Sequence, residues 1–129
     1  MTAIVLDASA LLVLLHKEMG WQLVAERLGG AMISAVNLTE VMDELAAKGM
    51  SADIAKDALE LLRLDIRDFT RSQAEVASAL LPHTKSFKLS LADRVCLSLA
   101  KMESAVVLTC DLSWKLVQDA VGVEVLLIR

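Results

Sequence analysis

The fold is decided by the stretch Ile4-Val5-Leu6, which leads directly into Asp7 and then into Ala8-Ser9-Ala10-Leu11-Leu12. Three consecutive apolar residues predict a strand buried on both faces, as in a parallel sheet, and the residues after Asp7 predict a helix. Asp7 therefore stands at the carboxyl end of a buried strand, the edge where α/β sheets bind ligands. Because an unpaired carboxylate is costly in such apolar surroundings, we take Asp7 as the anchor of a functional site.

Short apolar strands and amphipathic helices alternate along the rest of the chain. We expect strands at residues 4–6, 31–33, 64–67, 105–108 and 123–128. We expect helices at residues 8–15, 21–28, 35–47, 52–62, 71–81 and 91–102, and a short one near 113–117. This alternation predicts an α/β fold, a three-layer α/β/α sandwich around a central, mostly parallel sheet of about five strands. At this length, residues 1–129 are expected to form a single domain.

Hydroxyl residues mark the starts of several expected helices. Ser34, Ser51, Thr70 and Ser90 each stand where a side-chain oxygen can cap a helix N-terminus. The only proline, Pro82, is expected to end the helix that begins at residue 71, and residues 83–88 are expected to form a basic loop.

Hydrophobic residues make up 56% of the chain, so a membrane-spanning class has to be considered. The longest stretch without a charged residue, 28–39, has 12 residues and includes two glycines, whereas a spanning helix needs about 20 apolar residues. The N-terminus lacks the basic segment of a signal peptide. We therefore expect no membrane contact, and interpret the apolar excess as a sheet covered on both faces plus the surface of a homodimer.

Cysteines and charge narrow the class further. Cys96 and Cys110 lack metal-binding spacing, and we expect two small, buried, reduced residues in a cytoplasmic protein. The net charge of −4 argues against a general nucleic-acid binder, which normally carries a basic excess. If four of the 17 acidic residues share one metal site, however, the 13 others balance the 13 Lys and Arg residues.

Four acids stand out on this map: Asp7 after the first strand, Glu40 and Asp93 in helices, and Asp111 after the strand 105–108. Each also has a purely structural explanation. Asp7 and Asp111 can be N-caps, Ser90-Leu91-Ala92-Asp93 fits a capping box, and Asn37-Leu38-Thr39-Glu40 resembles one. The carboxyl ends of parallel strands meet at one edge of a sheet, however, and carboxylates gathered there repel unless a cation is present. Oxygen ligands favour Mg²⁺ or Mn²⁺ over zinc.

The four acids lie in segments that follow a known order along the chain: Ile4 to Leu11, Ser34 to Val41, Leu89 to Leu97 and Leu108 to Trp114. Together these segments resemble the four acidic blocks of the PIN-domain ribonucleases. Among these ribonucleases, they are most similar to the bacterial VapC-type toxins of type II toxin–antitoxin modules. The resemblance covers almost the whole chain, both in length and in the order of the blocks.

The resemblance implies which residues form the site. The family's catalytic, metal-binding carboxylates fall on Asp7, Glu40, Asp93 and Asp111, and its supporting hydroxyls fall on Ser9 and Thr109. The two hydroxyls are equally well explained as ordinary cap and turn residues. The chain departs from the family where a further acid often follows the fourth, because positions 112 to 114 are Leu, Ser and Trp. Whether one or two metal ions bind is therefore left open.

The resemblance also implies an activity, the endonucleolytic cleavage of RNA by a toxin that depends on Mg²⁺ or Mn²⁺. A metal held by Asp7 and Asp93 would activate water as the nucleophile, and Glu40 would orient or deprotonate that water or bind the metal directly. Two alternatives stay open. Another metal-dependent phosphotransfer enzyme, such as a phosphatase of the haloacid-dehalogenase kind, normally has a second Asp where this chain has Ser9. A non-catalytic PIN-fold binding module would keep the fold without the chemistry.

Two partners are expected. Lys85, Lys88 and Arg94 precede or flank Asp93 and could contact RNA phosphates, although a solvated basic loop also explains the two lysines. The resemblance further implies a cognate antitoxin, a small protein that would cover the acidic cleft. We expect it to bind apolar surface on the helices that carry Leu11, Leu12, Leu15, Leu23, Leu59 and Leu62.

Overall fold

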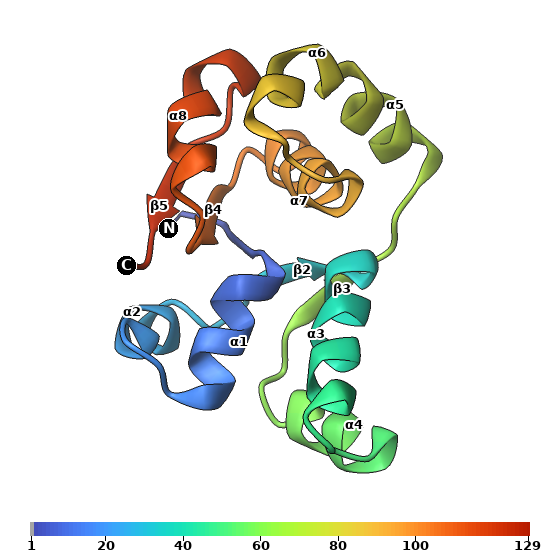
Figure 1. The fold of residues 1–129 in the computed structure, drawn as a ribbon, viewed down its shortest axis with the longest axis vertical. Coiled ribbons are helices and arrows are strands. Elements are labelled where there is room, and N and C mark those ends of the chain that lie inside the picture. The colour runs from blue at the N-terminus through green and yellow to red at the C-terminus, as the bar shows by residue number, and fades with distance from the viewer. Residues whose placement is uncertain (1) are drawn as a thin grey trace.

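The computed structural model describes residues 2–129 (Figure 1). Its centre is a five-stranded parallel sheet in the order β3-β2-β1-β4-β5. The strands are β1 (Ile4–Leu6), β2 (Met32–Ser34), β3 (Asp65–Arg67), β4 (Val106–Thr109) and β5 (Val125–Leu127). The predicted parallel sheet of about five strands is confirmed.

Helices cover both faces of this sheet. The first four along the chain are α1 (Ala8–His16), α2 (Trp21–Glu26), α3 (Ala35–Ala47) and α4 (Ala52–Glu60). The others are α5 (Arg71–Ala79), α6 (Leu81–Thr84), α7 (Leu91–Met102) and α8 (Leu112–Val121). Figure 1 shows α1 to α4 on one side of the sheet and α5 to α8 on the other.

The two faces of the sheet build two hydrophobic cores, because successive side chains of a strand point to opposite faces. Val5 and Val107 pack in the core formed with α7 and α8. Leu6 and Leu108 pack in the other core, with the helices α1 to α4. This arrangement confirms the predicted three-layer α/β/α sandwich.

The predicted hydroxyl caps are confirmed. Oγ of Ser34 accepts a hydrogen bond from the backbone N–H of Val36 at 3.2 Å, which fixes the start of α3. Ser51, Thr70 and Ser90 cap α4, α5 and α7 in the same way. The predicted bounds of α3 and α7 are therefore those of the structure.

The region around Pro82 differs from the prediction. The preceding helix, α5, ends at Ala79, before the proline, and Pro82 lies in the first turn of the short helix α6. Pro is tolerated there because the first N–H groups of a helix have no intrahelical acceptor. The expected basic loop is instead the end of α6 followed by a 3₁₀ turn, Lys85–Phe87. Further along, α8 is longer than the expected short helix at 113–117.

Two expectations about apolar residues are corrected by their burial. Leu11 is 0% exposed and Leu59 is 7% exposed, so these leucines belong to the core and offer little surface to a partner. The other four leucines of that prediction are only partly buried, and they too pack against this core. Of the two free cysteines, Cys96 is buried as expected, whereas Cys110 is only half-buried.

The strand order places β1 and β4 side by side at the centre. From β1 the chain runs outward to β2 and β3, and it then crosses back to add β4 on the other side of β1. Chain direction across the sheet therefore reverses between β1 and β4, and ligands of open α/β sheets bind at the carboxyl ends of such a strand pair. No helix within residues 2–129 is both long and apolar enough to cross a membrane.

Candidate functional site

A cavity of about 250 Å³ opens at the carboxyl ends of β1 and β4. Its lining includes all four predicted acids, Asp7, Glu40, Asp93 and Asp111, together with Asn37 and Trp114. The acids come from four different elements or their caps, so the fold brings together residues that are separated by up to about a hundred positions in the sequence. The structure thus gathers around one cavity the acids that the sequence analysis singled out.

Asp7 is the most buried of the four acids, with 6% of its surface exposed. Its Oδ1 accepts hydrogen bonds from the Ser9 hydroxyl at 2.7 Å and from the Ala10 backbone N–H at 2.8 Å. Its Oδ2 accepts one from the Thr109 hydroxyl at 2.5 Å. Burial raises the pKa of Asp7 from 3.8 to about 6; the three hydrogen bonds oppose this rise, and the charge of Asp93 adds to it.

Ser9 and Thr109, the two predicted supporting hydroxyls, also bind the loop after β4. Oγ of Ser9 accepts a hydrogen bond from the Cys110 backbone N–H at 3.0 Å. Oγ1 of Thr109 accepts one from the Asp111 backbone N–H at 3.1 Å. Each hydroxyl therefore donates to Asp7 and accepts from this loop, and together they fix Asp7 relative to Asp111.

Asp93 forms the capping box that the sequence predicted as its purely structural role. Its Oδ2 accepts a hydrogen bond from the Ser90 backbone N–H at 2.9 Å, and Ser90 Oγ accepts one from the Asp93 backbone N–H at 3.1 Å. This is the predicted capping box of α7. The pKa of the Asp93 carboxyl is raised, mainly by burial and in addition by the charge of Asp111, while the hydrogen bonds with Ser90 oppose the rise. Capping and a place in the cavity are therefore compatible.

Asp111 and Glu40 are the exposed members of the set. Asp111 caps α8, and its Oδ1 accepts hydrogen bonds from the backbone N–H and the hydroxyl of Ser113 at 2.9 and 2.7 Å. Oε1 of Glu40 accepts a hydrogen bond from Asn37 Nδ2 at 2.9 Å. The expected capping box of Asn37 and Glu40 is wrong, because Ser34 caps α3 and both residues lie inside the helix.

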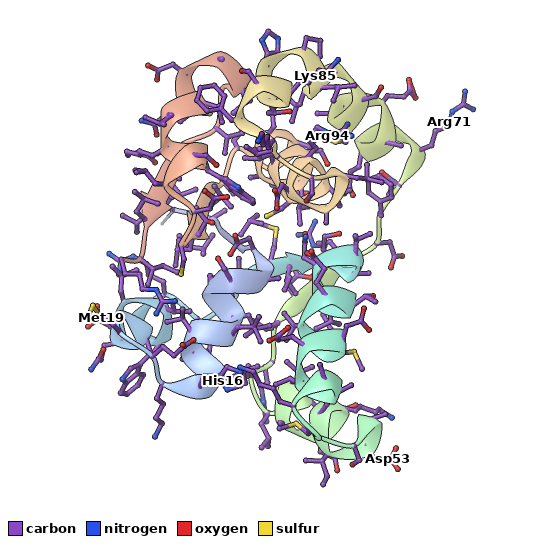
Figure 2. The ribbon with its side chains drawn as sticks, viewed as in Figure 1. His16, Met19, Asp53, Arg71, Lys85 and Arg94 are labelled. Atoms are coloured by element: carbon purple, nitrogen blue, oxygen red, sulfur yellow. The ribbon has the colours of Figure 1, made fainter. Side chains whose placement is uncertain are left out.

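The expected phosphate contacts lie outside the lining of the cavity. Lys85 and Lys88 are exposed, and Figure 2 shows Lys85 at α6. One terminal N–H of the Arg94 guanidinium donates to the Ala77 carbonyl of α5 at 2.9 Å, so this side chain joins α7 to α5. Four residues that line the cavity were not among the predicted site residues: Ala8, Leu12, Asn37 and Trp114. The only sequence signal for Asn37 is its position one helical turn before Glu40.

The chemistry of the cavity suits a hard divalent cation, since its charged groups are all carboxylates. Two of these, Asp7 and Asp93, have pKa values raised by burial and by a neighbouring negative charge, both of which a bound cation would offset. Within residues 2–129, no three His, Cys, Asp or Glu side chains already converge with the spacing of a metal cluster. Some of these carboxylates would therefore have to move to surround an ion, and Asp7 would move least because three hydrogen bonds hold it.

Comparison with known proteins gives the family. No curated protein sequence matches the chain significantly. Similar solved structures include DNA-bound VapBC from Salmonella typhimurium, with 17% identity over 100% of both chains and a TM-score of 0.75. VapBC-1 from nontypeable Haemophilus influenzae matches with 15% identity over 98% of both chains and a TM-score of 0.75. VapC20 from Mycobacterium tuberculosis, a Sarcin-Ricin loop cleaving toxin, matches with 19% identity over 88% of this chain and 94% of that chain and a TM-score of 0.70.

At these identities the solved structures show a shared fold. The sequence itself matches the family model described as PIN domain over residues 4–119, which is most of the chain. This protein therefore belongs to the PIN domain family.

Proposed function

We propose that this protein is a metal-dependent endoribonuclease, the toxin of a type II toxin–antitoxin system, and that residues 1–129 act as one catalytic domain. The observation that carries the proposal is the cavity lined by four carboxylates at the carboxyl ends of β1 and β4 in a PIN domain chain. The similarity to VapBC complexes and to an RNA-cleaving toxin supports the same class. No feature of residues 2–129 favours a phosphatase or a purely binding module over a nuclease.

Mg²⁺ or Mn²⁺ is the proposed cofactor, held by Asp7 and Asp93 with contributions from Asp111 and Glu40. A bound divalent ion would lower the pKa of water and offset negative charge on the phosphodiester. The chain's own contribution is to hold the carboxylates in place. Asp7 is fixed by three donors, so its oxygens need little reorganisation when the ion and the substrate arrive. Glu40, which is exposed at the cavity, would bind the ion or orient the attacking water.

RNA is the proposed substrate, and Lys85, Lys88 and Arg94 are the candidate phosphate contacts. The two lysines are free to reach a phosphate backbone, because both are exposed in the segment that precedes α7. Arg94 is already bound to the Ala77 carbonyl, so its contact with RNA would be partial. Contacts of this kind position a nucleic acid without reading its sequence.

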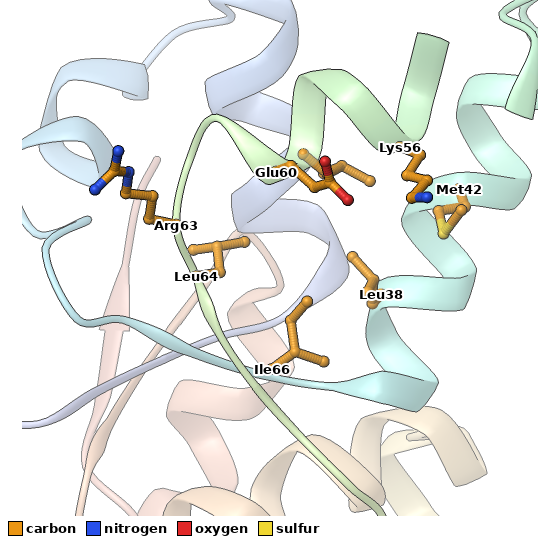
Figure 3. Close-up of a pocket in the computed structure, with 8 residues that line it drawn as sticks. Leu38, Met42, Lys56, Glu60, Arg63, Leu64 and Ile66 are labelled. Atoms are coloured by element: carbon orange, nitrogen blue, oxygen red, sulfur yellow. The ribbon is translucent and has the colours of Figure 1, made fainter. Parts of the chain in front are cut away.

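An antitoxin is the proposed protein partner, because the similar solved structures include a toxin–antitoxin complex from Klebsiella pneumoniae. A groove of about 290 Å³ between α3, α4 and β3 offers it an apolar surface (Figure 3). The groove is lined by Leu38, Met42, Leu64, Ile66 and the largely buried Leu59, with Lys56, Glu60 and Arg63 beside them. An amphipathic antitoxin helix would bury its apolar face there and pair its charges with these three residues.

A second copy of the chain is the other proposed partner. Leu112 and Leu116 lie one turn apart on α8 and are 62% and 64% exposed. Exposed apolar residues on one helix face mark an interaction surface, and a homodimer would bury this one.

The proposed reaction is tested by incubating purified protein with total RNA, with Mg²⁺ and with EDTA, and mapping the cut ends. Attack by water on phosphorus leaves the RNA 2′-OH unused, so we expect 5′-phosphate and 3′-hydroxyl ends and no cleavage in EDTA. Ends carrying 2′,3′-cyclic phosphate would contradict a metal-dependent mechanism. Calorimetric titration with Mg²⁺, beside this assay, tests the alternative of a non-catalytic binding module. Such a module would leave RNA uncut even under conditions in which calorimetry shows that Mg²⁺ is bound.

A further inference from the structure

The side-chain amide of Asn37 joins α3, which carries Glu40, to α7, which carries Asp93. It is 1% exposed within α3 and lines the acidic cavity. Its Nδ2 donates to Glu40 Oε1 at 2.9 Å and to the Ala92 carbonyl at 3.0 Å. Ala92 lies in the first turn of α7, immediately before Asp93. Both donor hydrogens of the amide are therefore used to hold the Glu40 carboxylate against the helix that carries Asp93.

The other polar atom of the amide, Oδ1, destabilises the folded protein. Oδ1 of Asn37 is buried and has no hydrogen-bond donor among residues 2–129. A buried oxygen without a donor is destabilising, and an apolar side chain of the same shape would avoid the loss. The stability of α3 therefore does not explain an asparagine here, whereas the contact with Glu40 does.

We propose that Asn37 is a positioning residue that holds Glu40 at the acidic cavity; the inference rests on the proposed nuclease function. Glu40 is exposed and sits on a helix surface, where a long side chain is free to sample solvent-facing rotamers. Asn37, three residues earlier on the same face, restricts these rotamers through its hydrogen bond. Its second bond, to Ala92, fixes the distance between α3 and α7 and thus between the carboxylates of Glu40 and Asp93.

The test replaces Asn37 by leucine, which has a similar branched shape and no polar atoms. Side chains that orient metal ligands typically change metal affinity by about 10-fold to 100-fold when removed. We expect Asn37→Leu to raise the dissociation constant for Mg²⁺, measured by calorimetry without RNA, by about that factor. The metal-free melting temperature should change little, because the loss of the hydrogen bond to Ala92 is offset by the removal of the unpartnered Oδ1 and by the buried apolar side chain.

A matched control is available in α5. Gln73 is also a buried amide on a helix, 7% exposed, with an oxygen, Oε1, that has no donor within residues 2–129. It does not line the acidic cavity. Gln73→Leu should therefore leave Mg²⁺ affinity and RNA cleavage at wild-type values. If Asn37→Leu fails to fold, Asn37→Ala removes the same two donor hydrogens with a smaller side chain and is measured in its place.

A double-mutant cycle tests whether Asn37 acts through Glu40. If it does, Asn37→Leu combined with Glu40→Gln should bind Mg²⁺ no more weakly than Glu40→Gln alone. Independent, multiplicative losses would overturn the inference. So would an Asn37→Leu protein that melts lower but binds Mg²⁺ like wild type, because the amide would then be purely structural. A wild-type protein that binds no divalent ion and cuts no RNA would instead refute the proposed function, and this inference with it.

Discussion

The hydroxyl of Thr109 donates a 2.5 Å hydrogen bond to Oδ2 of Asp7, across the two central strands and 102 residues along the chain. Oγ1 of Thr109 also accepts a hydrogen bond from the backbone N–H of Asp111, so the single hydroxyl hydrogen is left for Asp7. Thr109 is fully buried, and this bond is therefore shielded from water. A hydrogen bond to a carboxylate favours its charged form. The pKa of Asp7, raised to about 6 by burial, would be higher still without Thr109.

The first prediction is that the metal-free protein loses stability as the pH rises through 6. The folded state binds the Asp7 proton more tightly than the unfolded state, because burial raises this pKa from 3.8 to about 6. The favourable contribution is complete below 3.8 and is lost as the pH passes about 6. At about 1.4 kcal/mol per pKa unit, the loss is about 3 kcal/mol.

Urea unfolding in EDTA between pH 4 and 7.5 measures this dependence. Asp7→Asn provides the control, because an amide does not titrate. The difference in unfolding free energy between the two proteins should grow in favour of the variant over this range. A constant difference would show that the pKa of Asp7 is not raised in the folded state.

The second prediction concerns Thr109→Val, which keeps the shape of the side chain and removes its donor. The pKa of Asp7 should rise above its wild-type value of about 6, since a bond that favours the carboxylate is removed. Carbon-13 NMR titration of the aspartate carboxyls in the metal-free protein measures it directly. Thr84→Val is the matched control, because Thr84, in α6, is equally buried but donates to the Leu80 carbonyl. An unchanged Asp7 titration in Thr109→Val would contradict the role of the hydroxyl.

The bounds of the central elements could be predicted because local signals mark them. The apolar run before Asp7 marks β1, and the hydroxyl caps Ser34 and Ser90 mark the starts of α3 and α7. The segment around Pro82 was predicted wrongly because proline is compatible with both a helix end and a first helical turn. Which of the two occurs depends on how α6 packs against α8, and such packing leaves no local pattern in the sequence.

The place of Asp7 and Asp111 could also be predicted, because the carboxyl ends of parallel strands share one edge of the sheet. Glu40 and Asp93 lie in helices, and the family resemblance indicated them. The contact between Asn37 and Ala92 joins positions 55 residues apart, so no spacing along the chain indicates it. The sequence pattern of Asn37 and Glu40 also resembled a capping box, but the structure has the other predicted cap, Ser34, and both residues lie inside the helix. Arg94 follows Asp93 in sequence, yet its guanidinium points to α5, because consecutive residues of a helix face different directions.

The third prediction distinguishes the two lysines, as RNA phosphate contacts, from Arg94, whose side chain also stabilises the fold. Lys85→Ala and Lys88→Ala should each weaken the binding of single-stranded RNA, and each should lower the salt dependence of log Kd by about 0.7 for every phosphate that is no longer neutralised. Their melting temperatures should stay at the wild-type value, because both side chains are exposed. Arg94→Ala should instead lower the melting temperature, since it removes the hydrogen bond to Ala77. Fluorescence anisotropy in EDTA at several salt concentrations measures binding without cleavage. An unchanged salt slope in both lysine variants would remove them from the interface.

The fourth prediction concerns the apolar groove. Ile66 is 50% exposed on the edge strand β3, and Ile66→Lys places a charge in the groove with little effect on the core. RNA cleavage and melting temperature should stay at wild-type values, whereas a co-expressed antitoxin should no longer copurify or inhibit. Met102→Lys is the control, because Met102 is exposed to a similar degree, 46%, at the end of α7 and outside the groove. Retained inhibition of Ile66→Lys would place the antitoxin elsewhere.

The last prediction decides between capping and metal binding at Asp7 and Asp93. Both residues cap helices, Asp7 through the Ala10 N–H and Asp93 through the Ser90 N–H. Asparagine is nearly as good a cap as aspartate, so Asp7→Asn and Asp93→Asn remove a negative charge while keeping most of the cap. If capping is the only role, each variant should lose about 0.3 to 1 kcal/mol of helix-dipole stabilisation, set in Asp7→Asn against the gain from removing a buried charge, and should respond to Mg²⁺ and cut RNA like wild type.

If the two acids hold the metal, the metal-free variants should instead be as stable as wild type or more stable, because the buried negative charge and its repulsion with neighbouring acids are relieved. Added Mg²⁺ at a hundredfold excess over its dissociation constant should stabilise wild type by about 2.7 kcal/mol and leave the variants almost unchanged. RNA cleavage should fall by orders of magnitude in both. Melting curves with Mg²⁺ and with EDTA, measured beside a cleavage assay, separate the two roles, and a variant that cuts RNA at close to the wild-type rate would exclude its acid from the metal site.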